Sequence, residues 1–399
     1  MRPSFSRLVL GAAGLLIASL VSGCEAPADP AVATRPGDPL PGLGDAETGR
    51  FLLGKAVFER LATEEEGLGP LFNAARCSSC HEDPTSGGTS AVRVAKAAIW
   101  EPAEGRCDLL QDQGGDNFQS SATELLQRHG MGPEVIPPEA NSRASVLAPT
   151  LYGLGLVEGI PASVLQELAD PEDRDGDGVS GRLGVDETGT PGRFGRKGEV
   201  PSLRGFVDTA LRFELGFSTP DHPWEEPVNG TPVPPGADPM GEPEIDDRGI
   251  DLLADYIRYL APPARRRYEA GPIRDSVAAG EVLFGEVGCS DCHTPALKTG
   301  RSEVSALSRV DVPLYSDLLL HDLGPELAGV CGPGAAPTEH RTARLWGLGL
   351  RTEYLHDGRA GTLEEAVSLH GGEAAASRAA FDGLATDDRR RLIRFLESL

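Results

Sequence analysis

The chain has 399 residues, of which 39% are apolar and 25% are charged, and this ordinary globular composition excludes a protein that is disordered or membrane-embedded throughout. The formal net charge of −24 produces a surface that repels phosphate backbones, which argues against a nucleic-acid partner. With 50 Gly, 33 Pro and 5% aromatic residues, the chain is expected to be rich in loops, with a core that is either small or completed by a bound apolar cofactor.

The N-terminus has the pattern of an export signal. A basic start is followed by an apolar run over residues 8–21, which is too short to span a bilayer comfortably. Small residues then precede Cys24, which is typical of a lipoprotein signal peptide (1–23) whose cleavage leaves a lipid on Cys24. An ordinary signal peptide with an incidental cysteine is the alternative. Glu25 favours the periplasmic side of the outer membrane, and residues 24–45 are expected to form a Pro-rich tether.

The remaining chain contains several motifs twice, in the same order. Folding is expected to begin near Ala46 with a helix. The repeated motifs are a Leu-Phe pair, a Cys-x-x-Cys-His motif, a Leu-aromatic-Gly-Leu-Gly-Leu motif and a short helical stretch; they stand at 71–72, 77–81, 151–156 and 162–169 in the first copy and at 283–284, 289–293, 345–350 and 362–369 in the second. Such an ordered repeat indicates two domains derived from one ancestral unit.

The duplication predicts the domain organisation and the fold class. Residues 46–265 are interpreted as an N-terminal c-type haem domain with insertions, and residues 272–399 as a C-terminal cytochrome c domain. Apolar residues recur at helical spacing over 246–260, and a final helix is expected over 386–399, with Thr386 as its N-cap. Because strand signals are sparse, we predict a mainly α fold of two cytochrome c-like haem domains with long loops.

The two Cys-x-x-Cys-His motifs predict two covalently bound haem c groups. Two thiols three positions apart can add to the two vinyl groups of one haem, and the following His can bind the iron. We therefore expect Cys77, Cys80 and His81 to hold the first haem. The second haem is expected on Cys289, Cys292 and His293. The competing interpretation, a zinc site built from the four cysteines, leaves both histidines unexplained.

Several further stretches resemble the di-haem oxidoreductase family, whose members are described as bacterial peroxidases or thiol oxidoreductases. The stretches are GLGPLFNAARCSSCH (67–81), APTLYGLGLVEGIP (148–161), DRDGDGVSGR (173–182), GRFGRKG (192–198), EIDDRGIDLLADYIRYLAPPARR (244–266), LLLHDLGPELA (318–328) and RTARLWGLGLRTEYLHDGRAGTLEEAVSLHGGEA (341–374). The resemblance covers most of residues 46–399. It implies similarity to the di-haem cytochrome c peroxidases, in which one haem activates peroxide and the other relays electrons.

Two positions depart from the pattern that this resemblance implies. The peroxidases usually carry a Met, the sixth iron ligand, immediately before the His-Asp-Gly of the second domain, and Leu355 stands there in this chain. Arg196 stands where a Trp is more frequent in the family.

The sixth ligand of the second haem is expected to be His356. Neutral imidazole is a good iron ligand, and haem potential depends strongly on its axial ligands. The predicted iron ligands are therefore His81, His293 and His356, with His321 and His370 as weaker candidates.

The first copy has no His or Met in the place that matches His356, so the first haem is expected to be the reactive one. Peroxide reduction also needs a group that moves protons. Glu158 stands in the matching place, and a buried Glu with a raised pKa can act as acid or base. The alternative is that Glu158 caps a helix or pairs with an Arg.

An acidic loop predicts a calcium site. Asp173, Asp175 and Asp177 match the opening of a calcium-binding loop, in which alternate carboxylates converge on the ion. The twelfth position is Gly184 rather than Glu, so a missing oxygen would come from elsewhere, with Asp186 or Glu187 as candidates. An acidic surface turn is the alternative.

Two cysteines, Cys107 and Cys331, remain unassigned. In an oxidising compartment they can form a disulfide that joins the two predicted domains, and two buried free thiols are the alternative.

These predictions describe an exported di-haem cytochrome of the periplasm. We expect electron transfer coupled to a redox reaction at one haem, with peroxide as the small-molecule oxidant and an unknown periplasmic electron donor. The alternative is a pure di-haem electron carrier without catalytic activity.

Overall fold

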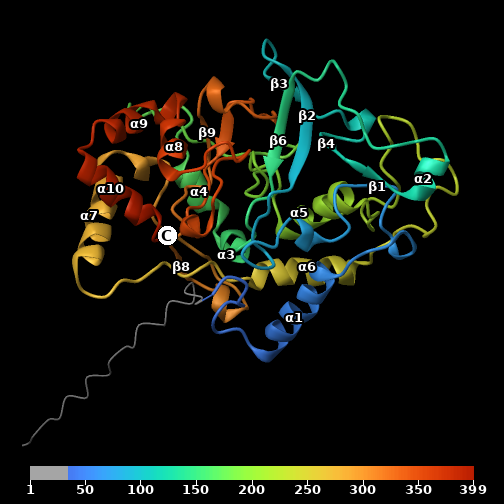
Figure 1. Cartoon of the computed structure of the whole chain (residues 1–399), viewed down its shortest axis with the longest axis horizontal. Coiled ribbons are helices and arrows are strands. Elements are labelled where there is room, and N and C mark those ends of the chain that lie inside the picture. The colour runs from blue at the N-terminus through green and yellow to red at the C-terminus, as the bar shows by residue number, and fades with distance from the viewer. Residues whose placement is uncertain (1–34) are drawn as a thin grey trace, which may run out of the picture.

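The computed structural model describes residues 35–399, and Figure 1 shows their arrangement. The predicted signal peptide, Cys24 and most of the tether lie outside the described residues. The helices are α1 (Asp45–Glu59), α2 (Glu124–Arg128), α3 (Leu154–Gly159), α4 (Ala162–Leu168), α5 (Leu203–Ala210), α6 (Asp247–Tyr259), α7 (Pro272–Glu286), α8 (Leu363–Ser368), α9 (Ala375–Asp382) and α10 (Thr386–Leu396). The strands are β1 (Leu71–Phe72), β2 (Arg93–Glu101), β3 (Arg106–Asp108), β4 (Asn117–Phe118), β5 (Ser121–Ala122), β6 (Ser142–Leu147), β7 (Leu297–Lys298), β8 (Asp311–Val312), β9 (Leu320–Asp322) and β10 (Glu339–Arg341). No helix in this described part is long and apolar enough to cross a membrane.

The end of the predicted tether is folded. Leu40 is only 2% exposed, and its backbone N–H donates to the carbonyl of Tyr259 over 2.8 Å. The N–H of Ala261 in turn donates to the carbonyl of Asp38. Residues 38–44 therefore pack against the end of α6, and the prediction of an extended tether up to residue 45 is wrong for this segment.

The first helix pair is formed by α1 and α6, which cross at Gly54. A Cβ atom on Gly54 would lie 2.0 Å from the carbonyl oxygen of Leu252, so only glycine allows this close approach. One turn further along, the rings of Phe58 and Tyr256 lie 4.9 Å apart. The prediction of an amphipathic helix over 246–260 is confirmed by α6.

The second helix pair, α7 and α10, repeats this crossing. A Cβ atom on Gly280 would lie 2.0 Å from the carbonyl oxygen of Arg391. One turn on, the rings of Phe284 and Phe395 lie 5.3 Å apart. Figure 1 shows α7 and α10 with α8 and α9 at the end of the molecule opposite to α2. Helix α10 starts at Thr386 with Ala385 as its N-cap, so the predicted capping role of Thr386 is wrong.

The glycines at the two helix crossings, Gly54 and Gly280, change which residues of the two copies correspond. Phe284 corresponds to Phe58 of α1, not to Phe72, which lies in the short strand β1. Phe58 precedes Cys77 by 19 positions, whereas Phe284 precedes Cys289 by 5. The first copy therefore contains an insertion between its helix and its Cys-x-x-Cys-His motif, and the Leu-Phe match in the sequence was coincidental.

The two Leu-Gly-Leu motifs are equivalent in structure. Gly153 and Gly347 both adopt positive φ, at 71° and 74°, and both precede a helical turn. A Cβ atom on Gly155 would lie 1.9 Å from the carbonyl oxygen of Arg258 near the end of α6, and one on Gly349 would lie 2.4 Å from that of Glu397 just after α10. Each motif thus packs against the C-terminal end of its own helix pair.

A β-sheet that the sequence did not predict is inserted into the first copy. Strand β2 pairs antiparallel with β3, β4 and β6, as the labelled strands in Figure 1 show. The prediction of abundant helices is confirmed, but this sheet makes the chain more mixed than the expected mainly α fold. The largest apolar core also draws on both predicted domains, because Leu314 and Trp346 belong to the same cluster as Tyr256.

Candidate haem sites

The first Cys-x-x-Cys-His motif forms a 3-10 turn (Cys77–Ser79) beside α1. Nδ1 of His81 lies 3.1 Å from the carbonyl oxygen of Gly88. Because a carbonyl only accepts, Nδ1–H donates to it, which is the tautomer that leaves the Nε2 lone pair for a metal; the carbonyl of Pro149 is a second backbone acceptor beside the ring. Burial lowers the pKa of His81 to about 4, which keeps the ring neutral. The Phe58 ring lies 6.2 Å from the His81 ring.

The second motif repeats this geometry at Cys289–Asp291 beside α7. Nδ1 of His293 lies 2.9 Å from the carbonyl oxygen of Tyr315, and burial lowers the pKa of His293 to about 4. The Phe284 ring lies 6.4 Å from the His293 ring. Both histidines are therefore held in the tautomer and protonation state that an iron ligand requires.

The cysteines of both motifs are free thiols in the structure. Burial raises the pKa of Cys77 and of Cys289 to about 12, so these sulfurs are neutral rather than thiolate. Within residues 35–399 no group of three or more Cys or His side chains converges on one point. This arrangement does not support the alternative of a four-cysteine zinc site, which requires converging thiolates.

Buried donors without partners surround the two Leu-Gly-Leu motifs. Arg344 donates to the carbonyl of Thr150 over 3.1 Å, and Arg351 to the Thr150 hydroxyl over 3.0 Å. The Nε atoms of both arginines and Nε1 of Trp346 are buried and have no hydrogen-bond partner. Within the described residues neither guanidinium forms an ion pair. Burial lowers the pKa of both arginines, which shows how costly these charges are without an anion.

These buried donors fit a haem, because each haem carries two carboxylate groups that could accept hydrogen bonds from them. Trp346 of the second copy also lies against Gly153 of the first, where an added Cβ would be 2.5 Å from the indole. Trp346 thus joins the two copies. Arg196 is buried, and its guanidinium donates to the carbonyl of Leu147.

Glu158 takes the alternative role that the sequence left open. Its Oε2 accepts from Nε of Arg258 over 2.7 Å, and its Oε1 accepts from the backbone N–H of Leu203, the first residue of α5. Glu158 therefore pairs with an arginine and caps a helix at the same time. The ion pair with Arg258 and the contact with the start of α5 give Glu158 a structural role, so the predicted catalytic role is not supported.

A different carboxylate lies beside the first haem motif. Glu214 belongs to a single π-helical turn (Leu211–Leu215), a feature that is often found at functional sites. Its two oxygens accept from the side-chain amides of Asn73 (3.0 Å) and Asn117 (2.9 Å). Burial raises the pKa of Glu214, and its charge helps to raise the pKa of Cys77 and Cys80. Sequence reasoning missed Glu214, whose only signal was an acid among apolar residues.

His356 stacks on His340, with ring centroids 4.7 Å apart. Burial lowers the pKa of His356 to about 4, and the nearby charges are those of Asp357, Arg196, Arg359 and Lys197. His340, whose Nε2 lies 2.8 Å from the carbonyl oxygen of Leu327, completes the stack. None of these neighbours belongs to the second haem motif, so the role of His356 as sixth ligand stays a prediction.

The two weaker histidine candidates differ in what their nitrogens contact. Both nitrogens of His321 are bound, Nε2 to Asp317 and Nδ1 to Glu373, each over 2.8 Å. Burial would lower the pKa of His321, but these hydrogen bonds raise it to about 12, so the ring is cationic and has no free lone pair.

His370 is free to bind a metal. Its Nδ1 lies 2.7 Å from the carbonyl oxygen of Ala366, which leaves Nε2 unprotonated. Burial is the main cause of the lowered pKa of His293, and the charge of His370 lowers it further. The two rings therefore lie close enough to interact electrostatically.

The acidic loop brings Asp173, Asp175 and Asp177 together, with one oxygen of each within 4.8 Å of the others. Asp186 instead accepts hydrogen bonds from Thr188 and Thr190, and Glu187 accepts from Gln111. Neither expected extra ligand is therefore available. Asp291 of the second haem motif interacts with the loop, because burial and the charges of Asp177 and Asp175 raise its pKa. Calcium at this loop stays a prediction.

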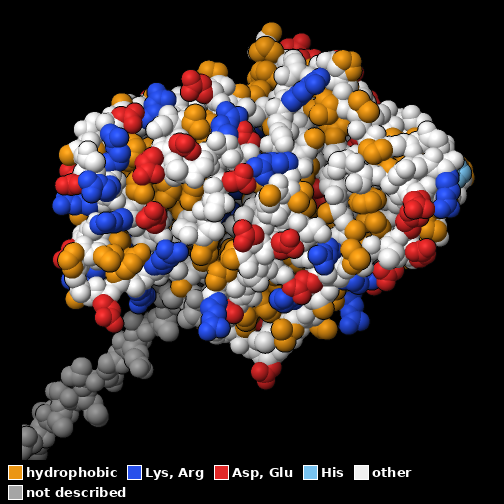
Figure 2. All heavy atoms as spheres, viewed as in Figure 1, with side chains coloured by type: hydrophobic (Ala, Val, Ile, Leu, Met, Phe, Trp, Pro, Cys, Tyr) orange, Lys and Arg blue, Asp and Glu red, His pale blue; other side chains and the backbone are white. Residues whose placement is uncertain are grey.

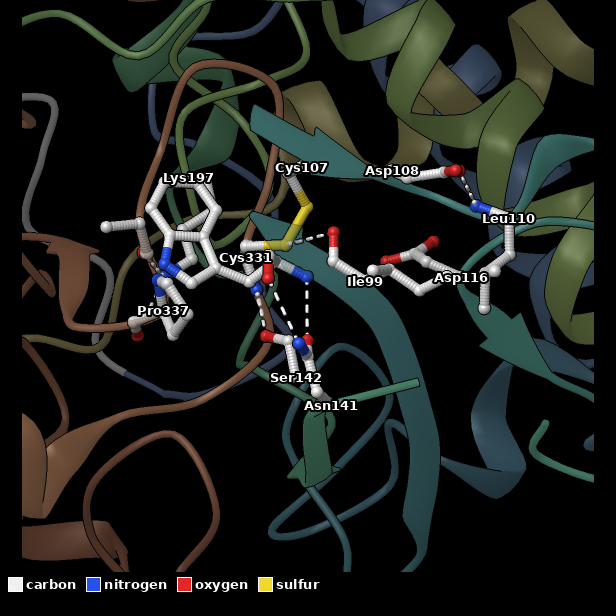
Figure 3. The surroundings of a disulfide bond; sticks show 12 residues. Ile99, Cys107, Asp108, Leu110, Asp116, Asn141, Ser142, Lys197, Cys331 and Pro337 are labelled. Atoms are coloured by element: carbon white, nitrogen blue, oxygen red, sulfur yellow. Dashed lines mark hydrogen bonds between the residues drawn. A yellow bond between two sulfur atoms is a disulfide. The ribbon is translucent and has the colours of Figure 1, made fainter. Parts of the chain in front are cut away.

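The disulfide between Cys107 and Cys331 is present, which confirms that prediction (Figure 3). Cys107 lies in β3, opposite Trp100 of β2, and the Cα atoms of the two cysteines are 5.8 Å apart. The backbone N–H of Cys331 donates to the Ser142 hydroxyl of β6 over 2.9 Å. The bond therefore ties the inserted sheet to a loop that follows the second haem motif.

Fold and site together define a haem-binding redox protein with two equivalent proximal-ligand sites. A family profile described as "Di-haem oxidoreductase, putative peroxidase" matches residues 142–399, and the chain belongs to this family. The family implies haem cofactors, in agreement with the residues above.

Comparisons with other proteins add little to the family assignment. A search of curated proteins finds no match. Among solved structures, hydrazine synthase from Kuenenia stuttgartiensis is 15% identical with a TM-score of 0.42, over 97% of this chain and 100% of the other. A MauG-like protein associated with microbial copper homeostasis is 14% identical with a TM-score of 0.40, over 92% and 93%. The di-haem peroxidase BthA from Burkholderia thailandensis is 16% identical with a TM-score of 0.34, over 92% and 89%. These TM-scores are too low to carry an argument.

Proposed function

We propose that this protein is a lipid-anchored periplasmic cytochrome that binds two haem c groups covalently and reduces peroxide at the first. The observation that carries the proposal is the repeated proximal site. In each copy a neutral His presents a free Nε2, because Nδ1 donates to a backbone carbonyl. In each copy two neutral thiols stand beside that His, as thioether formation with haem vinyl groups requires.

When bound, a haem iron with an open axial position supplies a site for peroxide and a route for electrons. The overall reaction consumes one hydrogen peroxide, two electrons from the periplasmic donor and two protons, breaks the O–O bond and yields two waters. The chain's own residues must handle the protons. Glu214 is suited to this task because its buried carboxyl has a raised pKa and is oriented by two amide donors.

The second site is proposed to relay electrons. His370 offers a free Nε2 near His293, and His356 remains the candidate from the sequence. Two imidazoles on one iron leave no open position, which suits electron transfer rather than catalysis. Trp346, which contacts the first copy at Gly153, is proposed as a residue on the electron route between the two sites.

Covalent attachment and spin state test the main proposal. The intact mass of the exported protein should exceed that of the polypeptide by two haems, and alanine at Cys77 and Cys80 should remove one of them. Electron paramagnetic resonance of the oxidised and half-reduced protein should show one high-spin and one low-spin iron. Two low-spin irons in every redox state would instead establish the pure electron carrier. Globomycin-sensitive labelling with palmitate tests the lipid on Cys24.

Paired substitutions test the proton-handling group. Glu214→Gln should lower peroxide turnover about 10²-fold or more, the size of a general acid–base contribution, with both haems attached. Glu158→Gln weakens a helix cap and an ion pair, so it should lower the melting temperature while leaving turnover per folded molecule unchanged. The opposite result, with turnover lost only in the Glu158 variant, would return the role to Glu158.

A further inference from the structure

A second cluster of carboxylates lies in the long loop between α5 and α6. One oxygen from each of Glu225, Asp238, Glu242 and Glu244 lies within 4.8 Å of the others. An open pocket lined by Glu225, Asp238, Glu242 and several prolines gives access to the group from solvent. This cluster is separate in sequence from the acidic loop at 173–177, and the proposed peroxide chemistry does not use it.

Glu244 is the buried member of the cluster. It is 8% exposed, and its Oε2 accepts from the Ser218 backbone N–H over 2.7 Å and from the Ser218 hydroxyl over 3.3 Å. Its Oε1 is buried and has no hydrogen-bond partner. Oε1 of Glu225 and Oδ2 of Asp238 are likewise buried without a partner. Three of the four clustered carboxylates thus carry a buried oxygen that no protein group satisfies.

The cluster lacks a compensating cation. Within residues 35–399, none of the four carboxylates forms an ion pair with a Lys, Arg or His side chain. Burial and the three neighbouring acids raise the pKa of Glu225 to about 10, and burial raises the pKa of Glu244 to about 8. Buried carboxylates this close repel each other unless they are protonated or bind a cation.

We propose that Glu225, Asp238, Glu242 and Glu244 bind one calcium ion. The donors are all carboxylate oxygens, with no nitrogen or sulfur, which selects a hard cation. Ca²⁺ accepts about six to eight oxygens in a flexible geometry, whereas Mg²⁺ usually keeps several waters and binds one or two carboxylates, so four carboxylates on one ion favour calcium. One oxygen of each residue lies within 4.8 Å of the others, close enough for a single cation to contact all four.

The ion closes the loop that begins directly after the π-helical turn. Glu244 binds Ser218, which follows Phe217, and a Cβ on Gly67 would meet both Phe217 and Glu244 at 2.7–2.8 Å. Calcium bound to Glu244 would therefore hold the segment that follows Glu214 in place. Gly67, which lies against both Phe217 and Glu244, precedes the first haem motif in the chain.

The test uses the holoprotein after treatment with EGTA and removal of the chelator. Asp175→Asn first disables the acidic loop at 173–177, so that isothermal titration with CaCl₂ reports on the proposed site alone. This variant should bind one Ca²⁺, and adding Glu244→Gln should weaken that binding at least 100-fold. Absence of calcium binding in Asp175→Asn, or unchanged binding after Glu244→Gln, would overturn the proposal.

Thermal melting in calcium and in EGTA gives a second test, because the difference in melting temperature between Glu244→Gln and the wild type should change sign between the two conditions. Calcium should raise the melting temperature of the wild type but not that of Glu244→Gln. In EGTA at pH 9, above the raised pKa of Glu244, Glu244→Gln should melt above the wild type, because it removes one charge from a repulsive group. A Glu244→Gln protein that melts below the wild type in EGTA at this pH would contradict the electrostatic argument.

Discussion

Substituting Ala for Gly280 should separate α7 from α10 and weaken the second haem site. An added Cβ would lie 2.0 Å from the carbonyl oxygen of Arg391, whereas an ordinary contact needs about 3.4 Å, so the helices must part by roughly 1.4 Å. Overpacking of this kind costs about 1–3 kcal/mol, and the better helix propensity of Ala returns about 0.4–1 kcal/mol. We therefore expect a net loss of about 1–2 kcal/mol in the free energy of unfolding.

The control is a second glycine in the same helix. Gly285 has no neighbour closer than 4.0 Å to an added Cβ, so Gly285→Ala should stabilise the protein by about 0.4–1 kcal/mol. Urea denaturation of the holoprotein, followed by circular dichroism and by the Soret band, measures both variants. The same contrast is expected between Gly54→Ala at the first crossing and Gly49→Ala in open space. Equal stability of Gly280→Ala and Gly285→Ala would show that the helices do not cross as closely as described.

Three further predictions concern other parts of the molecule. Replacing Cys107 and Cys331 together by Ser should lower the free energy of unfolding by about 2–4 kcal/mol, measured by denaturation without reductant, and reduction of the wild type should have a similar effect. Burial raises the pKa of Glu134 to about 7, so its contribution to stability falls as the pH rises from about 4.5 to 7. Glu134→Gln should therefore match the wild type at pH 5 and exceed it by on the order of 1–3 kcal/mol at pH 8, and an equal difference at both values would contradict the assignment. Leu355→Met should supply a thioether to the second iron and raise its reduction potential in a spectroelectrochemical titration, whereas an unchanged potential would place Leu355 away from that iron.

The sequence predicted the parts of the site that depend on contiguous residues. A Cys-x-x-Cys-His motif places its ligands on one turn, so local geometry alone determines their relation, and the structure keeps it in both copies. The glycines of the two Leu-Gly-Leu motifs were also identifiable, since a residue at positive φ before a helical turn requires glycine. The helices α6 and α10 followed from apolar periodicity.

The parts that the sequence missed depend on contacts between distant segments. Glu158 looked like a catalytic acid because its neighbours in the chain align with the second copy, but its partners come from α5 and α6, 45 and 100 positions away. Glu214 had no local motif, and its importance comes from Asn73 and Asn117, which two other segments supply. The sheet was missed because β3 and β4 have only three and two residues, so their pairing with β2 is what reveals them.

The proposed division of labour between the two haems depends on these distant segments. The proximal sides of the two sites are nearly the same, with matching glycine crossings, aromatic neighbours and carbonyl acceptors, so proximal ligation alone would make two similar irons. What differs are residues outside the motifs. The first site has a buried acid with a raised pKa, Glu214, whereas the second has His370 with a free nitrogen. A carboxyl can move protons but is a poor ligand for haem iron, and an imidazole closes an axial position. Under the proposed function, Glu214 suits the first site to chemistry and His370 suits the second to electron relay, so substitutions at these two residues should change function while leaving haem attachment intact.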